Sequence, residues 1–524
     1  MQPFPLLLHK FIDHAAKWHG DTAIVTGSGP SPARIGYAGL RERSMRLSGA
    51  FAALGLKTGD RIATLAWNTQ GHMESWYAAL GLGVTCHTLN PRIAPAQMIE
   101  MVTQAQDRVL VASADQADTV EAIAAACPTI AHVVILDEPS TAELKRPVLA
   151  RARLWEQQEL MDERGGHVAW GGFDEETEAG LCFTSGTTGA PKGVLYTHRS
   201  NYLQTLTVLQ ADVMALTARD VVLAAVPMFH ANGWGLAFAA PAAGATFVLP
   251  GRLTDGARMA ALIRGEGVTV AIGVATVWLG LIDHLEASGG DLPTLNRVIL
   301  GGAPVPQALM DRIEQRLGVT VQTSWGMTEL SPLGTISPVG ANNRDARRSG
   351  RAPVGVDLCV ADAEGVPLAR QRGAEGRLLV KGASVIDRYF GQDEPATDAA
   401  GWFDTGDLAV IDANGNLQIT GRSKDLIKSG GEWINPGEIE AIVGALPAVG
   451  LVAVIGRTDP KWGERPVVVV EERAGERLGE NDVRQALDGR IPRWWMPDAV
   501  VLLDAMPLAH TGKIDKARLR RELG

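Results

Sequence analysis

The chain has 524 residues, of which 46% are hydrophobic and 21% are charged, and its formal net charge is −10. A single hydrophobic core stops growing at about 250 to 300 residues, so we expect more than one domain. The composition is that of a soluble globular enzyme. The acidic balance excludes nucleic acid as a bulk partner, because binding to a phosphate backbone requires a basic face.

The N-terminal residues have no basic lead and only a short apolar run, so we expect no signal peptide. The four cysteines are scattered along the sequence, at Cys86, Cys127, Cys182 and Cys359. Free thiols in a reducing cytoplasm explain this spacing more simply than disulfides or a zinc site.

Residues 184–193 read Thr-Ser-Gly-Thr-Thr-Gly-Ala-Pro-Lys-Gly and follow an apolar lead-in. Such a loop can turn backbone N–H groups and hydroxyls toward a polyphosphate, with Lys192 supplying positive charge. It is not a Walker loop, because only two residues separate Gly186 from Gly189. It is not a nucleophile elbow either, because Phe183 stands where that motif needs glycine. The alternative is a flexible loop that binds nothing.

Apolar, β-branched runs recur between stretches with a helical pattern, at residues 221–226, 268–275, 298–300 and 467–470. This alternation predicts parallel sheets covered by helices. Ligands of such sheets bind at the carboxyl ends of the strands. Polar or glycine-rich motifs follow two of these runs directly, at residues 227–230 and 301–304.

Residues 221–251 contain no Asp, Glu, Lys or Arg, which makes this segment long enough to span a bilayer. Three prolines interrupt it, together with His230 and Asn232. We therefore expect a buried strand, a turn and a packed helix or second strand, and no transmembrane segment.

The expected domain boundary lies near residues 422–425. Before it, residues 412–416 (Asp-Ala-Asn-Gly-Asn) have the chemistry of a hairpin turn. After it, a helical pattern opens at Pro436, and residues 449–455 and 467–472 have the pattern of strands.

Further motifs follow the glycine-rich loop in order, at residues 227–234, 301–306, 324–329, 402–408, 421–432 and 507–515. Their order and spacing resemble the adenylate-forming superfamily of acyl-CoA synthetases, luciferases and peptide-synthetase adenylation domains, over essentially the whole chain. Residues 228–234 (Met-Phe-His-Ala-Asn-Gly-Trp) and 429–434 (Ser-Gly-Gly-Glu-Trp-Ile) are most similar to medium- and long-chain fatty acyl-CoA synthetases. Methylmercaptopropionate-CoA ligases look similar at the same places.

The resemblance implies an α/β fold with two domains. Residues 1–423 would form a large N-terminal adenylation domain of mostly parallel β-sheets covered by helices, with a small β-barrel-like part. Residues 424–524 would form a small mobile α/β domain.

Activation of a carboxylate by ATP brings several anions together, so the catalyst mainly positions them and neutralises charge. Glu329 is the candidate Mg²⁺ ligand, because one carboxylate with phosphate oxygens and waters is a usual Mg²⁺ site. Thr328 beside it can donate a hydrogen bond to the α-phosphate. An ionised Asp407 only accepts hydrogen bonds, so it can take both ribose hydroxyls, with Arg422 nearby from the domain junction.

By resemblance, the ATP site comprises the glycine-rich loop, the segment after residue 300 and the motif around residue 325. Its members are Thr184, Ser185, Gly186, Thr187, Thr188, Gly189, Lys192, Gly302, Ala303, Pro304, Ser324, Trp325, Gly326, Thr328, Asp407 and Arg422. The acyl site comprises His230, Trp234, Val274, Gly302, Trp325, Met327 and Ser331. His230 would orient the carboxylate and Trp234 would gate an acyl tunnel. The alternatives are a solvated loop charge for Lys192, a satisfied core histidine for His230 and plain core for Trp234.

The catalytic set implied for the reaction is Lys513, Thr328, Glu329 and His230. Lys513 would bridge the carboxylate and α-phosphate oxygens during adenylate formation and withdraw for thioester formation. Lys424 would be the hinge, with an exposed linker lysine as the alternative. The CoA site would be Ser429, Gly430, Gly431 and Glu432. The arginines at 344, 347, 348 and 351 are expected to form a solvated loop instead of a CoA-phosphate site.

The sequence departs from the family pattern at two positions. Arg377 stands where the family usually has glutamate, which we expect to be a surface change. Trp325 stands where many relatives have tyrosine, which alters the pocket wall.

The sequence therefore predicts an ATP-dependent acyl-CoA synthetase that uses Mg²⁺, ATP and CoA, with a medium- to long-chain fatty acid as the expected substrate. A homodimer is expected from the resemblance, and the scattered cysteines predict a cytoplasmic protein. A short thioether acid such as methylmercaptopropionate, or an aryl acid, is the alternative substrate. The rival from another class is a non-catalytic acyl- or nucleotide-binding protein. Joint retention of the adenylation residues argues against it.

Overall fold

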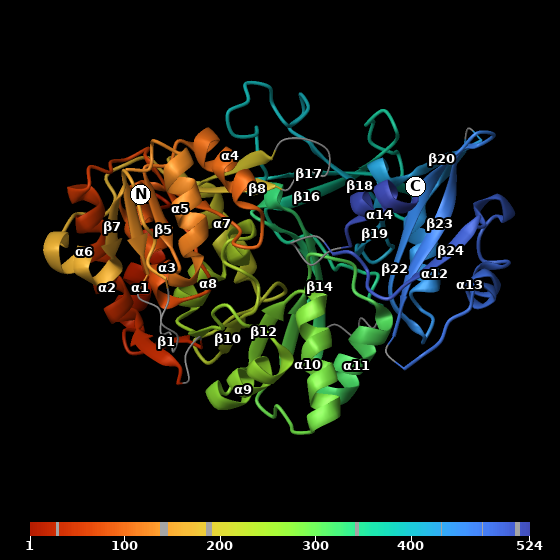
Figure 1. The fold of residues 1–524 in the computed structure, drawn as a ribbon, viewed down its shortest axis with the longest axis horizontal. Coiled ribbons are helices and arrows are strands. Elements are labelled where there is room, and N and C mark those ends of the chain that lie inside the picture. Colours follow the sequence, from red (N-terminus) through yellow and green to blue (C-terminus); the bar gives the residue numbers. More distant parts are fainter. Residues whose placement is uncertain are drawn as a thin grey trace.

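The structure, a computed structural model, describes residues 1–27, 31–136, 145–184, 191–340, 345–430, 432–473, 475–508 and 514–524. Its elements form two large sheets, a small antiparallel sheet and a C-terminal domain with a sheet of its own (Figure 1). The expected α/β fold with a separate C-terminal domain is confirmed.

The first large sheet has seven strands, parallel except for β9 at one edge. In spatial order they are β7 (Arg153–Glu156), β6 (His132–Ile135), β5 (Val109–Ala112), β3 (Arg61–Leu65), β4 (Thr85–Thr88), β8 (Glu178–Thr184) and β9 (Lys192–Thr197). Helices α4 (Pro95–Ala105) and α5 (Ala117–Ala126) cover one face, through a core around Leu110 and Val133. The short helix η1 (Ala114–Gln116) precedes α5.

The second large sheet has eight strands, and only its edge strands β15 and β2 run antiparallel to their neighbours. In spatial order they are β15 (Leu333–Ile336), β14 (Thr320–Gly326), β13 (Arg297–Leu300), β12 (Val270–Gly273), β10 (Val221–Ala224), β11 (Thr246–Leu249), β1 (Ala23–Thr26) and β2 (Ala33–Gly36). Helices α9 (Gly256–Glu266), α10 (Ala275–Ser288) and α11 (Gln307–Leu317) cover its outer face.

A layer of helices joins the two large sheets. One continuous core contains Cys86 of the first sheet, Val222 of the second and Trp76 between them. The helices of this layer are α1 (His9–Trp18), α2 (Tyr37–Ala53), α3 (Gln70–Gly81), α7 (His198–Val208) and α8 (Leu236–Ala243). Helix α6 (Gln157–Arg164) packs with α2 at the edge. Because both faces of the sheets are covered, their central strands are near-continuous apolar runs.

The uncharged segment 221–251 folds as predicted. It forms β10, a turn with the short helix η2 (Ala231–Gly235), the packed helix α8 and the strand β11. No helix in the described part of the chain is both long and apolar enough to cross a membrane.

The small antiparallel sheet has the order β16 (Val356–Ala361), β17 (Glu375–Gly382), β18 (Phe403–Ile411) and β19 (Leu417–Arg422). The expected β-barrel-like part corresponds to this sheet, which is open in the described residues because its edge strands β16 and β19 do not pair with each other. Its apolar face packs with Tyr196 of β9 and Trp325 of β14 in one core. The small sheet therefore meets both large sheets in the region where the motifs lie.

The C-terminal sheet follows a short helix, η4 (Ser423–Asp425). Its strands are β20 (Ile427–Ser429), β21 (Glu432–Ile434), β22 (Val449–Asp459), β23 (Gly463–Glu472) and β24 (Ala499–Leu503). Helices α12 (Pro436–Val443) and α13 (Glu480–Leu487) pack on one face, and α14 (Lys516–Leu523) packs on the other. The short helix η5 (Arg493–Trp495) precedes β24.

Candidate active site

Four adjacent parallel strands end at one edge of the eight-stranded sheet and bring the predicted motifs together. These strands lie in the order β14, β13, β12 and β10. The segments that follow them are η3 (Thr328–Leu330), Gly301–Pro304, Val274 and the stretch 227–235. Because parallel strands place their carboxyl ends at the same edge, these segments are neighbours, as in other open α/β sheets.

Glu329 is a buried carboxylate, 7% exposed, in η3. The Tyr389 hydroxyl donates to its Oε1 at 3.0 Å, and Lys192 Nζ lies 4.8 Å from the centre of the Tyr389 ring. Burial raises the pKa of Glu329, while the hydrogen bond from Tyr389 and the charges of Arg422 and Lys192 oppose that rise. The site thus holds a carboxylate that faces two cationic side chains.

The backbone around Glu329 is fixed from both sides. Tyr196 Oη donates to the carbonyl of Thr328 at 2.7 Å, and Ile386 N donates to the carbonyl of Glu329 at 3.0 Å. Among the described residues, no group of three or more His, Cys, Asp or Glu side chains is placed to hold a metal ion. A Mg²⁺ ion here would need phosphate oxygens and waters beside Glu329, which is a usual environment for this ion.

Asp407 joins β14 to the small sheet. Trp325 Nε1 donates to Asp407 Oδ2 at 2.9 Å, and Arg422 Nε lies 2.6 Å from Asp407 Oδ1. Asp407 and Arg422 are also cross-strand partners on β18 and β19. Asp407 is 1% exposed, whereas the Arg422 side chain is 42% exposed. The carboxylate is therefore oriented by an indole and a guanidinium, and the tryptophan that departs from the family pattern has a polar role.

Trp234 lies against the glycine-rich segment after β13. A Cβ on Gly301 would come within 2.8 Å of the Trp234 ring, and one on Gly302 would lie 3.7 Å from that ring and 3.6 Å from Val274. Trp234 has a positive φ of 57°, a conformation that is uncommon outside glycine. The absence of side chains at 301 and 302 lets the indole approach this backbone closely.

On its other side Trp234 borders a small cavity. The cavity has a volume of about 10 Å³, and its other lining residues belong to α7, the start of α8 and the turn after η3. They are Asn201, Gln204, Thr205, Val208, Gly235, Phe238 and Ser331. The structure therefore places Trp234 between this cavity and the strand end at Gly302.

Several other predicted residues border the same region. Ser324 Oγ donates to the carbonyl of Leu300 at 3.0 Å, which ties β14 to the end of β13. Met327 packs partly buried in the core with Trp325.

His230 precedes η2 and its backbone carbonyl accepts from Gly233 N at 2.9 Å. Gly326 lies so close to the carbonyl of Pro332 that a Cβ would overlap it. Ala303 and Pro304 follow Gly302 in the loop before α11.

Part of the predicted site lies outside the described residues: Ser185, Gly186, Thr187, Thr188, Gly189, Gly431 and Lys513. Their flanks are described. Thr184 and Lys192 are paired residues of β8 and β9, and the Thr184 hydroxyl donates to the carbonyl of Lys192 at 3.3 Å. Leu508 and Ile514, on the two sides of Lys513, form a bridge.

The predicted CoA residues lie at one end of the C-terminal sheet. Ser429 Oγ accepts from Arg465 Nη1 at 3.1 Å, and Gly430 has a positive φ of 61° beside the ring of Trp462. Glu432 begins β21 and is exposed. Lys424 lies in η4, and burial lowers its pKa.

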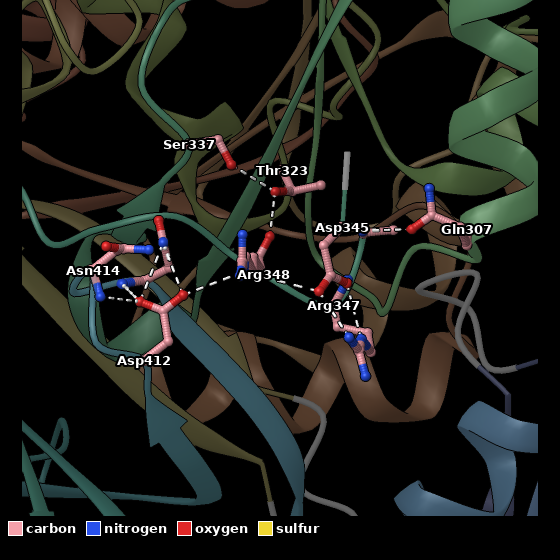
Figure 2. Close-up of polar contacts among 10 residues, drawn as sticks. Gln307, Thr323, Ser337, Asp345, Arg347, Arg348, Asp412 and Asn414 are labelled. Atoms are coloured by element: carbon pink, nitrogen blue, oxygen red, sulfur yellow. Dashed lines mark hydrogen bonds and ion pairs between the residues drawn. The ribbon is translucent and has the colours of Figure 1, made fainter. Parts of the chain in front are cut away.

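The arginine-rich loop is tied down by carboxylates (Figure 2). Arg347 pairs with Asp345 at 2.8 Å and keeps 65% of its side chain exposed, as expected for a solvated loop. Arg348 Nε lies 3.2 Å from Asp412 Oδ2 in the β18–β19 turn, and its carbonyl accepts from Thr323 Oγ1. Arg344 lies outside the described residues. Arg348 therefore connects β14 to the hairpin that carries Asp407.

The other departure from the family pattern, Arg377, is partly exposed, with 32% of its side chain accessible. It pairs with Asp404 on the neighbouring strand β18. The expected surface change is therefore compensated by a local carboxylate.

Sequence reasoning missed Tyr389, Asn201 and Gln204. Tyr389 belongs to none of the sequence motifs, and its neighbours along the chain gave no indication that it contacts Glu329. Asn201 and Gln204 did carry a signal, because they share one face of α7 with Val208 and are nevertheless polar. A polar pair on the buried face of a helix indicates a packed polar group or a ligand contact.

With this geometry in place, comparison with known proteins identifies the class. The AMP-binding enzyme model matches residues 11–390 and the AMP-binding enzyme C-terminal domain model matches residues 438–513. The chain belongs to the AMP-binding enzyme family. More particularly, it is an AMP-forming acid–CoA ligase that uses ATP and CoA as substrates, which confirms the resemblance found in the sequence.

Three similar proteins illustrate the relationship. The 3-methylmercaptopropionyl-CoA ligase of Ruegeria lacuscaerulensis is 40% identical over 100% of this chain and 98% of its own. The long-chain-fatty-acid–CoA ligase of Thermus thermophilus is 38% identical over 99% of this chain and 95% of its own. The crystal structure of ATP-bound MatB from Rhodopseudomonas palustris superposes with a TM-score of 0.84 at 26% identity, over 99% of both chains.

Proposed function

We propose that Glu329, Asp407 and their partners form the nucleotide side of the active site. The observation that carries this is that two buried carboxylates lie near the end of β14, each with cationic or N–H/O–H neighbours: Glu329 follows this strand, and Asp407 accepts a hydrogen bond from Trp325 on it. Asp407 accepts the ribose hydroxyls of ATP, and Thr328 donates to its α-phosphate. Glu329 would hold Mg²⁺, which when bound neutralises charge on the phosphate oxygens.

The acid lies on the side of Gly302 where Trp234 and Val274 are found, and the nucleotide lies on the opposite side. A carboxylate oxygen of the acid, oriented by His230, forms a bond to the α-phosphorus of ATP, and the bond from that phosphorus to the pyrophosphate oxygen breaks. The CoA thiolate then attacks the carbonyl carbon of the acyl-adenylate, and AMP leaves. Lys513 neutralises the oxygens that meet in the first step, so preorganised charge is the main contribution of the protein.

The two steps need different partners, and we propose that the C-terminal domain supplies them in turn. Residues 424–524 rotate about Lys424, which lies in η4 between β19 and β20. Adenylate formation uses Lys513. Thioester formation uses Ser429, Gly430, Gly431 and Glu432 to line the path of the pantetheine arm. Closure in both states keeps water from a hydrolysable intermediate.

We propose an aliphatic acid, for which two classes come from the relatives, with an aryl acid as the alternative. A medium- to long-chain fatty acid is the expectation from the motifs, and it is supported by 37% identity to a medium-chain and 38% identity to a long-chain fatty acid ligase. A short thioether acid is supported by 40% identity to 3-methylmercaptopropionyl-CoA ligase. The small volume behind Trp234 favours the shorter acid, unless the indole moves as a gate.

AMP release from purified protein with Mg-ATP and CoA tests these assignments. Acids from acetate to palmitate are compared, with methylmercaptopropionate and benzoate added. A maximum between hexanoate and palmitate supports the fatty acid, and a maximum at methylmercaptopropionate supports the thioether acid. AMP release that does not depend on any added acid would contradict the proposed acyl site.

We also propose a homodimer that works in the cytoplasm. The four cysteines are free and buried, which suits a reducing compartment. The molar mass in solution, measured by light scattering, tests the dimer.

A further inference from the structure

The face of α7 that borders the cavity behind Trp234 is polar although it is buried. Asn201, Gln204 and Thr205 line the cavity and are 5%, 4% and 1% exposed. Their spacing places them on one face of the helix. A buried polar group costs free energy unless it forms a hydrogen bond, so the partners of this face show what the cavity is built to hold.

Two of the polar side chains around the cavity are satisfied within the protein. Thr205 Oγ1 donates to the carbonyl of Asn201 at 2.7 Å, and Ser331 Oγ donates to the carbonyl of Ser384 at 3.0 Å. These hydroxyls stabilise the cavity wall.

The carboxamides of Asn201 and Gln204, in contrast, are not fully hydrogen-bonded within the protein. Gln204 Nε2 donates to the carbonyl of Leu333 at 3.3 Å, which leaves its Oε1 without a partner among the residues that the structure describes. Within the same part of the chain, the hydrogen bond that Asn201 accepts from Thr205 goes to its backbone carbonyl, and its carboxamide forms none. An amide group has two donor hydrogens and an accepting oxygen. Both carboxamides therefore have unused capacity at the cavity wall.

We propose that Asn201 and Gln204 determine the specificity of the ligase by hydrogen bonding to a heteroatom in the acyl chain. The acid is short, and its far end carries a thioether sulfur, a keto oxygen or a hydroxyl. This rests on the proposed acyl site. The cavity of about 10 Å³ has room for one water-sized group, and Val208 and Phe238 complete an apolar wall for a terminal methyl. A long alkyl chain would leave both carboxamides unpaired in hydrocarbon.

Matched acids test the proposal. Methylmercaptopropionate and pentanoate differ only by sulfur in place of a methylene. 4-Oxopentanoate and 4-methylpentanoate differ only at C4, which carries a carbonyl oxygen in the first acid and a methyl group and a hydrogen in the second. The kcat/KM for AMP release is measured with each pair. Sulfur is a weak acceptor, so we expect the native enzyme to prefer the thioether by about tenfold. A keto oxygen is a full acceptor, and we expect a preference of about a hundredfold or more.

Asn201→Leu keeps the branching of the side chain at Cγ, adds volume and removes the amide, so we expect both ratios to fall to about one. Val208→Leu is the matched control, because it narrows the same cavity from the same helix face without changing its hydrogen bonds. It should lower kcat/KM for both members of a pair alike. A ratio of rates is independent of the amount of folded enzyme, so a partly unfolded variant cannot imitate the expected result.

Each contrary result would overturn a different part of the proposal. Equal rates within the pairs, a preference for the hydrocarbon acids, or a maximum at palmitate would overturn the proposal and leave the ligase activity standing. Unchanged ratios in Asn201→Leu would overturn the assignment to that residue. Absence of acid-dependent AMP release from acetate to palmitate would overturn the proposed function, and this inference with it.

Discussion

The carboxylate of Asp407 shows how one residue is prepared for a ligand. It receives a hydrogen bond from Trp325 Nε1 and forms an ion pair with Arg422, which together fix its direction for the ribose that we propose it binds. Trp325→Phe removes the indole donor and keeps an aromatic ring. A hydrogen bond to a charged group contributes about 1.5–3 kcal/mol, so we expect KM for ATP to rise by about tenfold or more. Acid-dependent ATP–pyrophosphate exchange at varied ATP concentration measures this KM.

Trp278→Phe is the control for this substitution. Trp278 is fully buried against the same sheet, and its Nε1 has no hydrogen-bond partner within the described residues. Its replacement should leave KM for ATP unchanged. An equal effect of both substitutions would mean that packing, and not the hydrogen bond to Asp407, sets the affinity.

A second residue, His72 on α3, makes the free energy of unfolding depend on pH. Trp76 Nε1 donates to His72 Nε2 at 3.0 Å, so the proton of the neutral ring lies on Nδ1, which faces the carbonyl of Trp67 at 2.9 Å. Burial lowers the pKa of His72 to about 4, whereas an unfolded histidine titrates at about 6.5.

Between these values only the unfolded chain binds the proton, so stability falls as the pH falls from about 6.5 to about 4, by about 1.4 kcal/mol per pH unit. Burial lowers the pKa of His198 to about 3, which acts in the same direction. In His72→Gln this contribution is absent. The urea concentration at the midpoint of unfolding should therefore fall less between pH 7 and pH 5 than it does for the native protein. The same loss in both proteins would contradict the assignment.

At the scale of elements, the β18–β19 hairpin that carries Asp407 and Arg422 depends on its turn. Asp412 Oδ1 accepts from the backbone N–H groups of Asn414 and Asn416, both at 2.8 Å, and Asp412 Oδ2 pairs with Arg348 (Figure 2). Asp412→Ala removes all of these, and we expect the free energy of unfolding to fall by about 2–3 kcal/mol.

Arg348→Ala is the matched comparison, because it removes the ion pairs of Arg348 with Asp412 and Asp345 and leaves the backbone hydrogen bonds of the turn in place. The Arg348 side chain is 37% exposed, and a solvated pair contributes about 0–1 kcal/mol. Urea unfolding of the two variants gives the comparison. A larger loss for Arg348→Ala than for Asp412→Ala would show that the loop before β16, and not the turn, holds the hairpin.

The elements also show what a sequence can and cannot predict. The runs at 221–226 and 298–300 became β10 and β13, because a strand buried on both faces must be apolar throughout. The turn at 412–416 and the start of α12 at Pro436 were predictable from local backbone chemistry. Tyr389 was not, because its contact with Glu329 joins residues that are 60 positions apart. Such contacts depend on how the small sheet packs on the large ones, which no local pattern encodes.

At the scale of the whole molecule, the C-terminal domain approaches the rest of the chain closely at β19. A Cβ on Gly421 would lie 2.5 Å from Asn435 Oδ1, and one on Gly437 would overlap the carbonyl of Thr420. These glycines let α12 pack against β19 in this arrangement. The rotation that we propose about Lys424 would exchange this contact for another, so residues that act in only one arrangement should affect only one half-reaction.

Lys513→Ala tests that consequence directly. Loss of one preorganised charge donor lowers a rate by about 10²–10³, so we expect acid-dependent ATP–pyrophosphate exchange to fall by that factor. Thioester formation from supplied acyl-adenylate and CoA should stay nearly intact, because in the proposed mechanism Lys513 takes no part in that step. Arg521→Ala is the control, since it removes an exposed positive charge from the same domain and should change neither rate. An equal fall of both half-reactions in Lys513→Ala would mean that this lysine does not alternate with the CoA residues, and that one arrangement of the domains serves both steps.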